Sequence, residues 1–400
     1  MINPRLEALS DYPFARLAAL IASATPPTDL RPIVLSVGEP QTLLPAFARE
    51  IIAREVAGWS KYPPNQGAPE LSRAIVGWLE RRYGIAAGVL DPTRHVLATA
   101  GSKEGVYVIG TVVVPQLKAD AQPAVMIPNP FYQVYLGAAR LAGAEAIFVD
   151  AHVGNGFLPD YHLIDEATWK RTALVYFCSP ANPQGAMADL AYLQRLIELC
   201  RRHDAVLAID ECYAEIYNGT PPPGGLQACL AMDETGGRDP FRNVAVFHSL
   251  SKRSSAAGLR SGFVAGDPRI VQMMIRWKTY GGTQIPLAIQ AASTALWGEE
   301  KHAEATRGFY RKNFEVAQSI LHNRFRYFTP DGGFFLWLDV GDGEAATRKL
   351  WEQAHVKVLP GGYLAHGKDA DNPARAYIRV ALVHDEATTR EALGRLAQVL

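Results

Sequence analysis

The segment Ser249-Leu250-Ser251-Lys252-Arg253 holds residue types suited to binding an aldehyde that carries a phosphate. A deprotonated lysine amine forms an imine with a carbonyl, and serine hydroxyls suit phosphate oxygens. Arg260, a few positions later, has a guanidinium that can donate two hydrogen bonds to the same phosphate oxygens. Pyridoxal phosphate combines the two groups. Alone, the segment fits a polar surface loop better, so the chemistry needs support from other residues.

Asp210 is placed to face a cation at the end of a buried strand. It directly follows the apolar run 205–209. An ionised aspartate beside a pyridinium nitrogen keeps the ring protonated and electron-withdrawing. A helix cap or a structural salt bridge is the alternative. Tyr213, three positions on, can donate to a phenolic oxygen of the cofactor or belong to the core.

Gly101-Ser102-Lys103 lies between a predicted strand and a predicted helix. Backbone amides at a helix start point outward, and the helix dipole favours an anion there. A plain turn with Ser102 as helix cap is the alternative. With Ser249, Ser251 and Arg260, this turn would complete a phosphate cup.

Three further residues can contact a flat ring or a carboxylate. Asn182, in Asn182-Pro183-Gln184-Gly185, can give its amide to a substrate carboxylate and a cofactor oxygen, or serve the turn alone. Tyr132 can stack on a heterocycle, or pack in the core. Arg379 interrupts an apolar strand and can bind a carboxylate with two hydrogen bonds, or pair with a distant acid.

The elements expected around these residues predict an α/β fold. Between about residues 94 and 266, short apolar runs alternate with helical patterns, which indicates a mainly parallel seven-stranded sheet covered by helices. Such a sheet binds ligands beyond the carboxyl ends of its strands. The predicted strands are 95–99, 124–127, 144–149, 173–178, 205–209, 244–247 and 262–265, and the helices between them include 104–114, 133–141 and 190–202.

Three regions are expected along the chain. Residues 1–44 form an N-terminal arm, with a helix at 16–22 and a strand at 33–37, that packs with the C-terminal part. Residues 45–285 form the large cofactor-binding domain. Residues 286–400 form a smaller α+β domain, with helices at 287–297 and 300–323 and strands at 326–328, 334–339, 357–359 and 377–381.

The composition is that of a globular enzyme. Forty basic residues balance 40 acidic ones, so no overall field would attract nucleic acid or an anionic membrane. Apolar runs fall short of the ~20 residues of a membrane-spanning helix, and no signal-peptide core follows the first residues. Four cysteines without a C-x-x-C pair favour reduced thiols and no metal site. We therefore expect a cytoplasmic protein.

In their order along the chain, these residues resemble the landmarks of the fold type I pyridoxal-phosphate aminotransferases of class I/II. The resemblance implies that Lys252 is the imine-forming lysine and proton shuttle, with Asp210 on the pyridine nitrogen. It also implies a homodimer in which Tyr62 enters the site of the partner subunit. The landmarks are Gly38-Glu39-Pro40, Tyr62, Gly101-Ser102-Lys103, Tyr132, Asn182-Pro183-x-Gly185, Asp210-x-x-Tyr213, Ser249-x-Ser251-Lys252, Arg260 and Arg379, of which Gly38, Asn182 and Arg379 would bind substrate.

Several longer strings resemble bacterial succinyldiaminopimelate aminotransferases more closely. This resemblance implies amino transfer between glutamate and N-succinyl-2-amino-6-oxopimelate in lysine and diaminopimelate biosynthesis. The cation for the distal groups stays open, as does whether Lys103 contacts phosphate or substrate. The strings are 3–6, 128–133, 211–213, 249–254, 260–266 and 359–361, and the candidate cations are Lys103, Arg276, Lys278, Lys368 and Arg375.

Two other functions compete with this one. A lyase, or an aminotransferase for aspartate, alanine or aromatic amino acids, would carry the same core motifs. A cofactor-sensing transcription regulator would need a basic helix-turn-helix, and none precedes the aminotransferase pattern that begins near Val34. An aminotransferase acting on small amino acids and 2-oxo acids is therefore the expected function.

Overall fold

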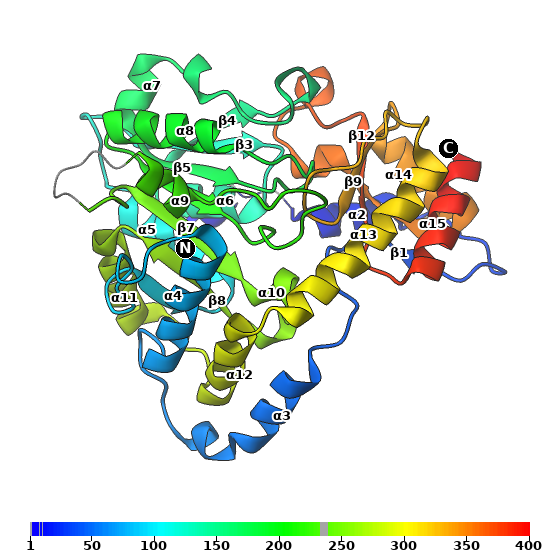
Figure 1. The fold of residues 1–400 in the computed structure, drawn as a ribbon. Coiled ribbons are helices and arrows are strands. Elements are labelled where there is room, and N and C mark those ends of the chain that lie inside the picture. Colours follow the sequence, from blue (N-terminus) through cyan, green and yellow to red (C-terminus); the bar gives the residue numbers. More distant parts are fainter. Residues whose placement is uncertain (1, 8, 10, 233–238) are drawn as a thin grey trace.

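A seven-stranded sheet organises the larger part of the chain. The computed structural model describes residues 2–7, 9, 11–232 and 239–400, and Figure 1 shows the sheet between layers of helices. In spatial order its strands are β2 (Val96–Thr99), β8 (Gly262–Gly266), β7 (Val244–Ser249), β6 (Val206–Asp210), β5 (Thr172–Cys178), β3 (Ala124–Asn129) and β4 (Glu145–Asp150).

The sheet is parallel except at β8. This strand runs antiparallel to both of its neighbours, β2 and β7, whereas the remaining pairs are parallel. The predicted α/β fold with a mainly parallel seven-stranded sheet is thus confirmed. Each of the seven predicted strands coincides with an observed one to within three residues at either end.

Both faces of this sheet are buried. Along β5, Val175 and Phe177 pack into the core on one face, and Leu174 and Tyr176 into the core on the other. Alternation of side chains along a strand produces this division, and burial on both faces explains the continuous apolar runs. The covering helices are α4 (Pro69–Tyr83), α5 (Ser102–Val113), α6 (Gln133–Leu141), α7 (Glu166–Arg171), α8 (Leu190–Arg202), α9 (Gly225–Ala231), α11 (Pro268–Gly281) and α12 (Leu287–Gly298). We call this part the large-sheet region.

The remaining elements surround two small sheets. β11 (Leu359–Pro360), β12 (Tyr377–Ala381) and β9 (Phe335–Asp339) form an antiparallel sheet, and β1 (Ile33–Val34) pairs in parallel with β10 (Val356–Lys357). Their helices are α2 (Pro13–Ile21), α13 (Lys301–Leu321), α14 (Gly343–Ala354) and α15 (Glu386–Val399). We call this part the small-sheet region; it lies to the right in Figure 1.

Short helices connect these parts. The α-helices are α1 (Pro4–Glu7), α3 (Ala46–Arg54) and α10 (Leu250–Arg253). The 3-10 helices are η1 (Val56–Ser60), η2 (Val153–Asn155), η3 (Tyr161–Leu163), η4 (Ala257–Leu259), η5 (Gly361–Leu364) and η6 (Asp369–Asp371).

The strand predicted at 326–328 was wrong. Phe325 and Arg326 have φ angles of 56° and 48°, and this left-handed backbone forms a turn where the pattern of apolar residues suggests a strand. The predicted strand at 33–37 is shorter in the structure, where it covers Ile33–Val34.

The expected boundaries at residues 44/45 and 285/286 stay predictions. β1 of the N-terminal arm pairs with β10, while α12, which follows residue 286, packs against α3 and α4. Residues 1, 8 and 10 of the arm lie outside the described residues.

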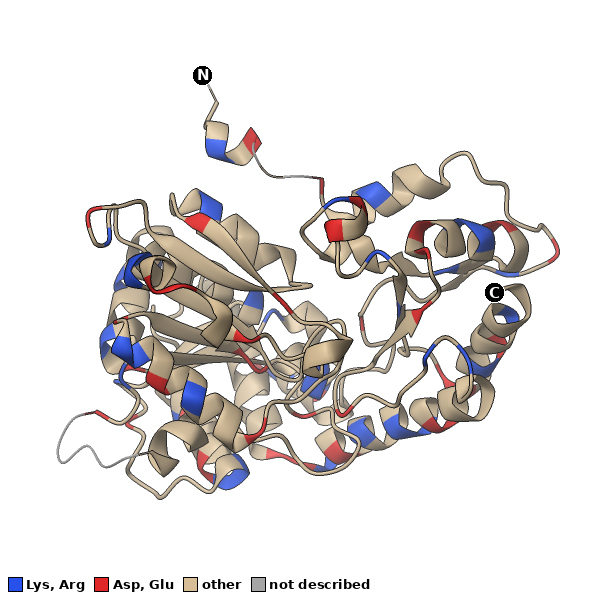
Figure 2. Cartoon of the chain, turned by 90° about the horizontal axis from the view of Figure 1, so that it is seen from above, with Lys and Arg blue, Asp and Glu red and all other residues tan. Residues whose placement is uncertain are grey.

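Residues of both charge signs are interspersed along the chain. In Figure 2, lysine and arginine positions are mixed with aspartate and glutamate positions along the helices. In the part of the chain that the structure describes, no helix combines the length and apolarity needed to cross a bilayer.

Candidate active site

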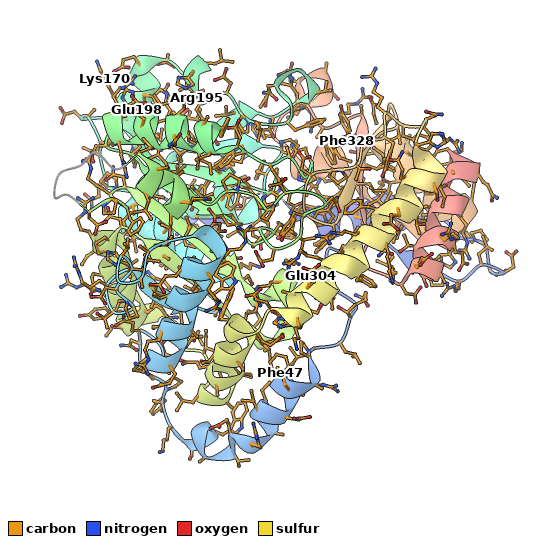
Figure 3. All side chains as sticks on the ribbon, in the orientation of Figure 1. Phe47, Lys170, Arg195, Glu198, Glu304 and Phe328 are labelled. Carbon is orange, nitrogen blue, oxygen red and sulfur yellow. The ribbon has the colours of Figure 1, made fainter. Side chains whose placement is uncertain are left out.

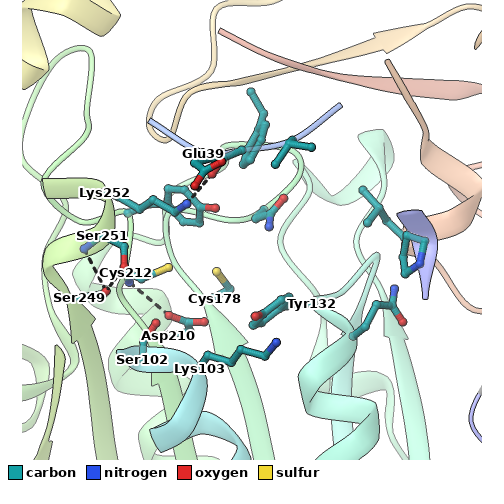
Figure 4. Close-up of a pocket in the computed structure, with 18 of the residues that line it drawn as sticks. Glu39, Ser102, Lys103, Tyr132, Cys178, Asp210, Cys212, Ser249, Ser251 and Lys252 are labelled. Atoms are coloured by element: carbon teal, nitrogen blue, oxygen red, sulfur yellow. Dashed lines mark hydrogen bonds between the residues drawn. The ribbon is translucent and has the colours of Figure 1, made fainter. Parts of the chain in front are cut away.

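One cavity gathers most of the residues singled out in the sequence. It opens beyond the carboxyl ends of β5, β6 and β7, where a sheet of this type binds ligands. Its volume of about 560 Å³ suits a cofactor with a small substrate. The lining residues include Gly38, Ser102, Lys103, Tyr132, Asn182, Asp210, Tyr213, Ser249, Ser251, Lys252, Arg260 and Arg379, and Figure 4 shows many of them facing one space.

Asp210 is a buried carboxylate at the cavity floor. It ends β6 and is 3% exposed. The Tyr135 hydroxyl donates to its Oδ2 at 2.7 Å, and the Cys212 amide donates to its Oδ1 at 3.2 Å. Burial raises the pKa of Asp210, and these two hydrogen bonds oppose that rise. No described lysine or arginine lies within ion-pair distance of Asp210, so the floor has an acceptor for a cation from a ligand.

Lys252 lies on α10, directly after β7. Its Nζ donates to the Gly38 carbonyl at 2.5 Å and lies 5.3 Å from the ring centroid of Phe334. Burial lowers the pKa of Lys252 to about 8. Because only a deprotonated amine is nucleophilic, this shift brings the amine within reach of neutral pH.

Small residues allow one corner of the cavity to collect hydrogen-bond donors. A Cβ on Gly262 would lie 2.9 Å from the Ser102 nitrogen, so glycine lets β8 approach the start of α5. Arg260 reaches the same turn, where its Nη2 donates to the Ala100 carbonyl at 3.1 Å. Ser249 Oγ lies 2.9 Å from Ser251 Oγ. Amides at a helix start, hydroxyls and a guanidinium together form a suitable phosphate site.

Gly101 stands just behind this corner rather than on the cavity wall. It is the N-cap of α5 and has a φ of 78°. A Cβ there would lie 2.6 Å from Arg260 Nη2. Glycine is therefore required for both the backbone angle and the approach of Arg260.

Arg379 is a buried arginine with an incomplete set of partners. Its Nη1 donates to Asn182 Oδ1 at 3.0 Å and its Nη2 to the Ser36 carbonyl at 2.8 Å, while its buried Nε has no partner among the described residues. Burial lowers the pKa of Arg379 to about 10, so it stays charged at neutral pH. No described carboxylate pairs with this guanidinium, so it is suited to binding an anionic ligand.

Aromatic side chains form the remaining walls. Tyr132 lines the cavity and contacts Tyr135 edge-on, with ring centroids 5.7 Å apart. The Tyr213 ring packs edge-on against Phe334 and Phe335 at 5.4 and 5.8 Å. A Cβ on Gly38 would lie 2.5 Å from the Phe335 ring, so this glycine allows the arm to pass close beneath it.

Some predicted residues do not meet in this cavity. Tyr62 is fully exposed and does not line it, so its expected place in a partner subunit stays a prediction. Among the candidate distal cations, Lys103 alone lines the cavity of this chain; in Figure 4 its side chain extends toward Tyr132. Lys278 is buried elsewhere, where its Nζ binds the Ala98 carbonyl at 3.1 Å and Glu104 at 3.3 Å.

Several residues that the sequence patterns did not single out also line the site. Tyr135 holds Asp210, and its spacing of three from Tyr132 could have indicated a shared helical face. Cys178 ends β5 and faces the same space. Tyr12 and Phe335 come from the arm and from β9, and no local pattern indicates that these distant segments meet.

Residues 31–396 match the family described as aminotransferase class I and II. The chain belongs to this family. Class I and II aminotransferases use pyridoxal 5′-phosphate, which confirms the predicted cofactor. Among the described residues, no group of three or more His, Cys, Asp or Glu side chains is placed to hold a metal ion.

Sequence relatives of this aminotransferase share its full length. It is 30% identical to the LL-diaminopimelate aminotransferase of Nitratidesulfovibrio vulgaris over 406 aligned positions, which cover 99% of this chain and 98% of the relative. It is also 30% identical to that of Desulforudis audaxviator, over 98% of this chain and 96% of the relative.

Solved aminotransferase structures superpose along the whole chain. An aminotransferase from Neisseria meningitidis has a TM-score of 0.93 and 37% identity, covering 99% of both chains. Aminotransferase AspB from Helicobacter pylori has a TM-score of 0.88 and 34% identity, covering 98% of both chains. The fold is therefore that of fold type I aminotransferases.

The residues present fit pyridoxal phosphate. Asp210 is a buried acceptor without a cationic partner among the described residues, which suits a pyridinium N–H. The corner with Ser102, Ser249, Ser251 and Arg260 offers donors for a phosphate. Lys252 offers a buried amine between them.

Proposed function

We propose that Lys252 is the catalytic residue of this aminotransferase. The observation that carries this proposal is one cavity that joins a buried lysine amine, a buried carboxylate and an arginine with an unpaired N–H. When bound, pyridoxal phosphate supplies an aldehyde for amines and a ring that withdraws electrons from the substrate α carbon. With the cofactor bound, Lys252 would take the proton from this α carbon and hold it on its Nζ for return to the cofactor.

The cofactor-binding residues divide between its two ends. Asp210 would accept the pyridine N–H, with Tyr213 and Asn182 near the phenolic oxygen and Tyr132 stacked on the ring. Gly101, Ser102, Ser249, Ser251 and Arg260 would hold the phosphate, together with the backbone amide of Lys103 in the first turn of α5, which leaves the Lys103 side chain for the substrate. The support is the position of these residues around one cavity, with Gly101 directly behind it.

The substrate α-carboxylate would bind Arg379 and Asn182. Arg379 lines the cavity and its Nε has no partner among the described residues, and the Asn182 amide oxygen already contacts the guanidinium. The Gly38 carbonyl accepts from Lys252 and so keeps this backbone next to the reacting atoms. A charge-assisted contact of this kind contributes about 1.5–3 kcal/mol, enough to orient an amino acid.

For the substrate, we propose amino transfer between glutamate and N-succinyl-2-amino-6-oxopimelate in lysine and diaminopimelate biosynthesis, in the cytoplasm. The strings shared with succinyldiaminopimelate aminotransferases support it, and Lys103 offers a cation for the succinyl carboxylate. The full-length relatives named LL-diaminopimelate aminotransferases favour a second candidate, diaminopimelate with a free distal amino group. Glu39, which also lines the cavity, offers a carboxylate for that ammonium.

A panel of acceptors with glutamate as donor tests this proposal. We expect the succinylated oxopimelate to give a higher kcat/KM than oxaloacetate, pyruvate or an aromatic 2-oxo acid. Preference for oxaloacetate would contradict the substrate proposal and leave the aminotransferase intact. Lys103→Gln and Glu39→Gln form a matched pair. If Lys103→Gln loses activity with the succinylated substrate, the succinylated oxopimelate is favoured as substrate. If Glu39→Gln loses activity with diaminopimelate, diaminopimelate is favoured.

We also propose a homodimer in which Tyr62 completes the partner's site. Tyr62 and Trp59 lie exposed on the segment after α3, and Tyr280 lies exposed near the end of α11. Mixing Tyr62→Ala with Lys252→Ala subunits tests this arrangement. A shared site predicts recovery of about a quarter of wild-type activity, because one hybrid site carries neither change. No recovery in a mixture shown to contain heterodimers would contradict it.

A further inference from the structure

Lys252 stands on a helix too short to hold its own position. α10 has four residues, and a single turn is unstable in isolation. Within the large-sheet region, the Leu250 amide donates to the Ser261 carbonyl at 3.1 Å and the Ser251 amide to Ser249 Oγ at 3.1 Å. The end of α10 that follows Lys252 is attached to the joint between α12 and α13.

Arg253 provides that second attachment. It is 2% exposed, and its Nη1 donates to the Leu296 carbonyl at 2.7 Å. Its Nη2 donates to the Glu299 carbonyl at 3.2 Å and to Glu300 Oε1 at 2.7 Å. Leu296 lies in the last turn of α12, and Glu300 is the N-cap of α13. One guanidinium thus binds free carbonyls after the end of α12, where a cation is stabilising, and the carboxylate of the residue that begins α13.

His302 forms a second connection between the turn that carries Lys252 and the start of α13. Burial lowers the pKa of His302, which favours the neutral ring. Its Nδ1 contacts Glu299 Oε2 at 2.6 Å, so Nε2 is left to accept from Ser254 Oγ at 2.8 Å and Arg253 Nη1 at 3.1 Å. Phe47 packs edge-on against the His302 ring at 5.8 Å, and Figure 3 places it below the start of α13.

α13 leads from this joint to the small-sheet region. Figure 3 places Glu304 near the start of the helix, and Figure 1 shows the helix running to α15. Farther along, Asn313 donates to the carbonyls of Leu382 at 3.0 Å and His384 at 2.8 Å. These residues directly follow β12, which carries Arg379. The contacts therefore connect the turn of Lys252 with the strand of Arg379.

We propose that Arg253 is a positioning residue, which fastens the turn of Lys252 to the joint between α12 and α13 and so places its amine relative to Arg379. This inference rests on the proposed role of Lys252. A buried arginine that only stabilised the fold would affect unfolding without changing the reactivity of the Lys252 amine.

The reaction of the apoprotein with pyridoxal, which lacks the phosphate, isolates this effect. The aldehyde condenses with the lysine amine and releases water, and borohydride reduction fixes the adduct for mass analysis. Arg253→Lys keeps the positive charge but loses the planar guanidinium with its several N–H donors. We expect the adduct between pyridoxal and Lys252 to form roughly tenfold more slowly in this variant. Ser254→Ala removes the hydroxyl that donates to His302 Nε2, and we expect the adduct to form about threefold more slowly.

Arg201→Lys is the matched control. Arg201 of α8 is also partly buried, its Nε donates to the Arg242 carbonyl at 3.1 Å and its Nη2 to the Pro240 carbonyl at 2.5 Å, and neither partner contacts Arg253. We expect it to lower the thermal midpoint while leaving the adduct rate unchanged. Unchanged rates in Arg253→Lys, or an equal slowing in Arg201→Lys, would overturn the inference.

Two further variants keep the outcomes distinct. If Arg253→Lys does not fold, Ser254→Ala decides, and an unchanged rate in it overturns the inference. Lys252→Ala reports labelling at other lysines. If wild-type protein reacts no faster than Lys252→Ala, the proposed function fails; if it reacts faster but Arg253 has no effect, only the positioning role fails.

Discussion

The two sides of the cavity differ in which segments supply hydrogen-bond partners to their buried charged residue. On the large-sheet side, Asp210 receives its donors from Tyr135 and Cys212, both in the same region. On the other side, Arg379 of β12 donates to Asn182 Oδ1 and to the Ser36 carbonyl of the arm, and its Nε has no partner among the residues that the structure describes. The first side is assembled by one sheet, whereas the second forms only where three segments meet. We infer that the first holds the cofactor and the second responds to substrate.

Removing the reacting amine should have the largest effect. Lys252→Ala should lower the rate of transamination by at least 10²–10⁴-fold, roughly the contribution of a positioned proton-transfer group. Retained pyridoxal phosphate in this variant would show that the large-sheet side binds it without the covalent bond. Rates measured with glutamate as donor check the loss, and near wild-type activity would contradict the assignment.

Removing the buried carboxylate should have the next largest effect. Asp210→Asn keeps the shape and loses the charge, and we expect kcat to fall by about 10²–10³-fold. The KM for glutamate should change far less, because Asp210 lies away from Arg379. A variant that mainly raised KM would break the division between the two sides.

Replacing Arg379, on the other side of the cavity, should weaken the binding of substrate carboxylates. Arg379→Gln should lower kcat/KM by about 10–100-fold, mostly through KM. Arg375→Gln is the control, because Arg375 is an exposed arginine on the same segment that pairs with Asp342 at 3.3 Å. We expect less than about a twofold change there. Equal losses in both variants would contradict the role of Arg379.

The pKa of Lys252 predicts a pH profile for the large-sheet side. Burial lowers this pKa to about 8, so the amine is mostly protonated below pH 8 and free above it. The reaction of the apoprotein with pyridoxal should therefore rise about tenfold per pH unit below 8 and level off above it. A midpoint near 10.5, the ordinary lysine value, would show an amine exposed to solvent.

The hydrogen bond from Tyr135 should have the smallest effect. Tyr135→Phe removes the donor to Asp210 Oδ2 and should lower kcat by about two- to tenfold. A change as large as that of Asp210→Asn would mean that the tyrosine acts on the ligand itself.

The sequence predicted the large-sheet side better than the small-sheet side, for a physical reason. Asp210, Lys252 and Ser102 each follow a buried strand or open a helix, so local patterns indicate their shared edge. Tyr12 and Phe335 reach the cavity only through packing between distant segments. Lys278 was considered for substrate binding, but it is buried against Glu104, and no local pattern separates these two outcomes.

We propose that Lys252 transfers the proton when an amino group moves from glutamate to the bound cofactor. The most direct test is a single turnover of the holoenzyme with glutamate and no acceptor. We predict a stoichiometric release of 2-oxoglutarate with a matching change in cofactor absorbance, and neither in Lys252→Ala. Release of 2-oxoglutarate at the wild-type rate by Lys252→Ala, or none by the wild-type protein, would contradict the account.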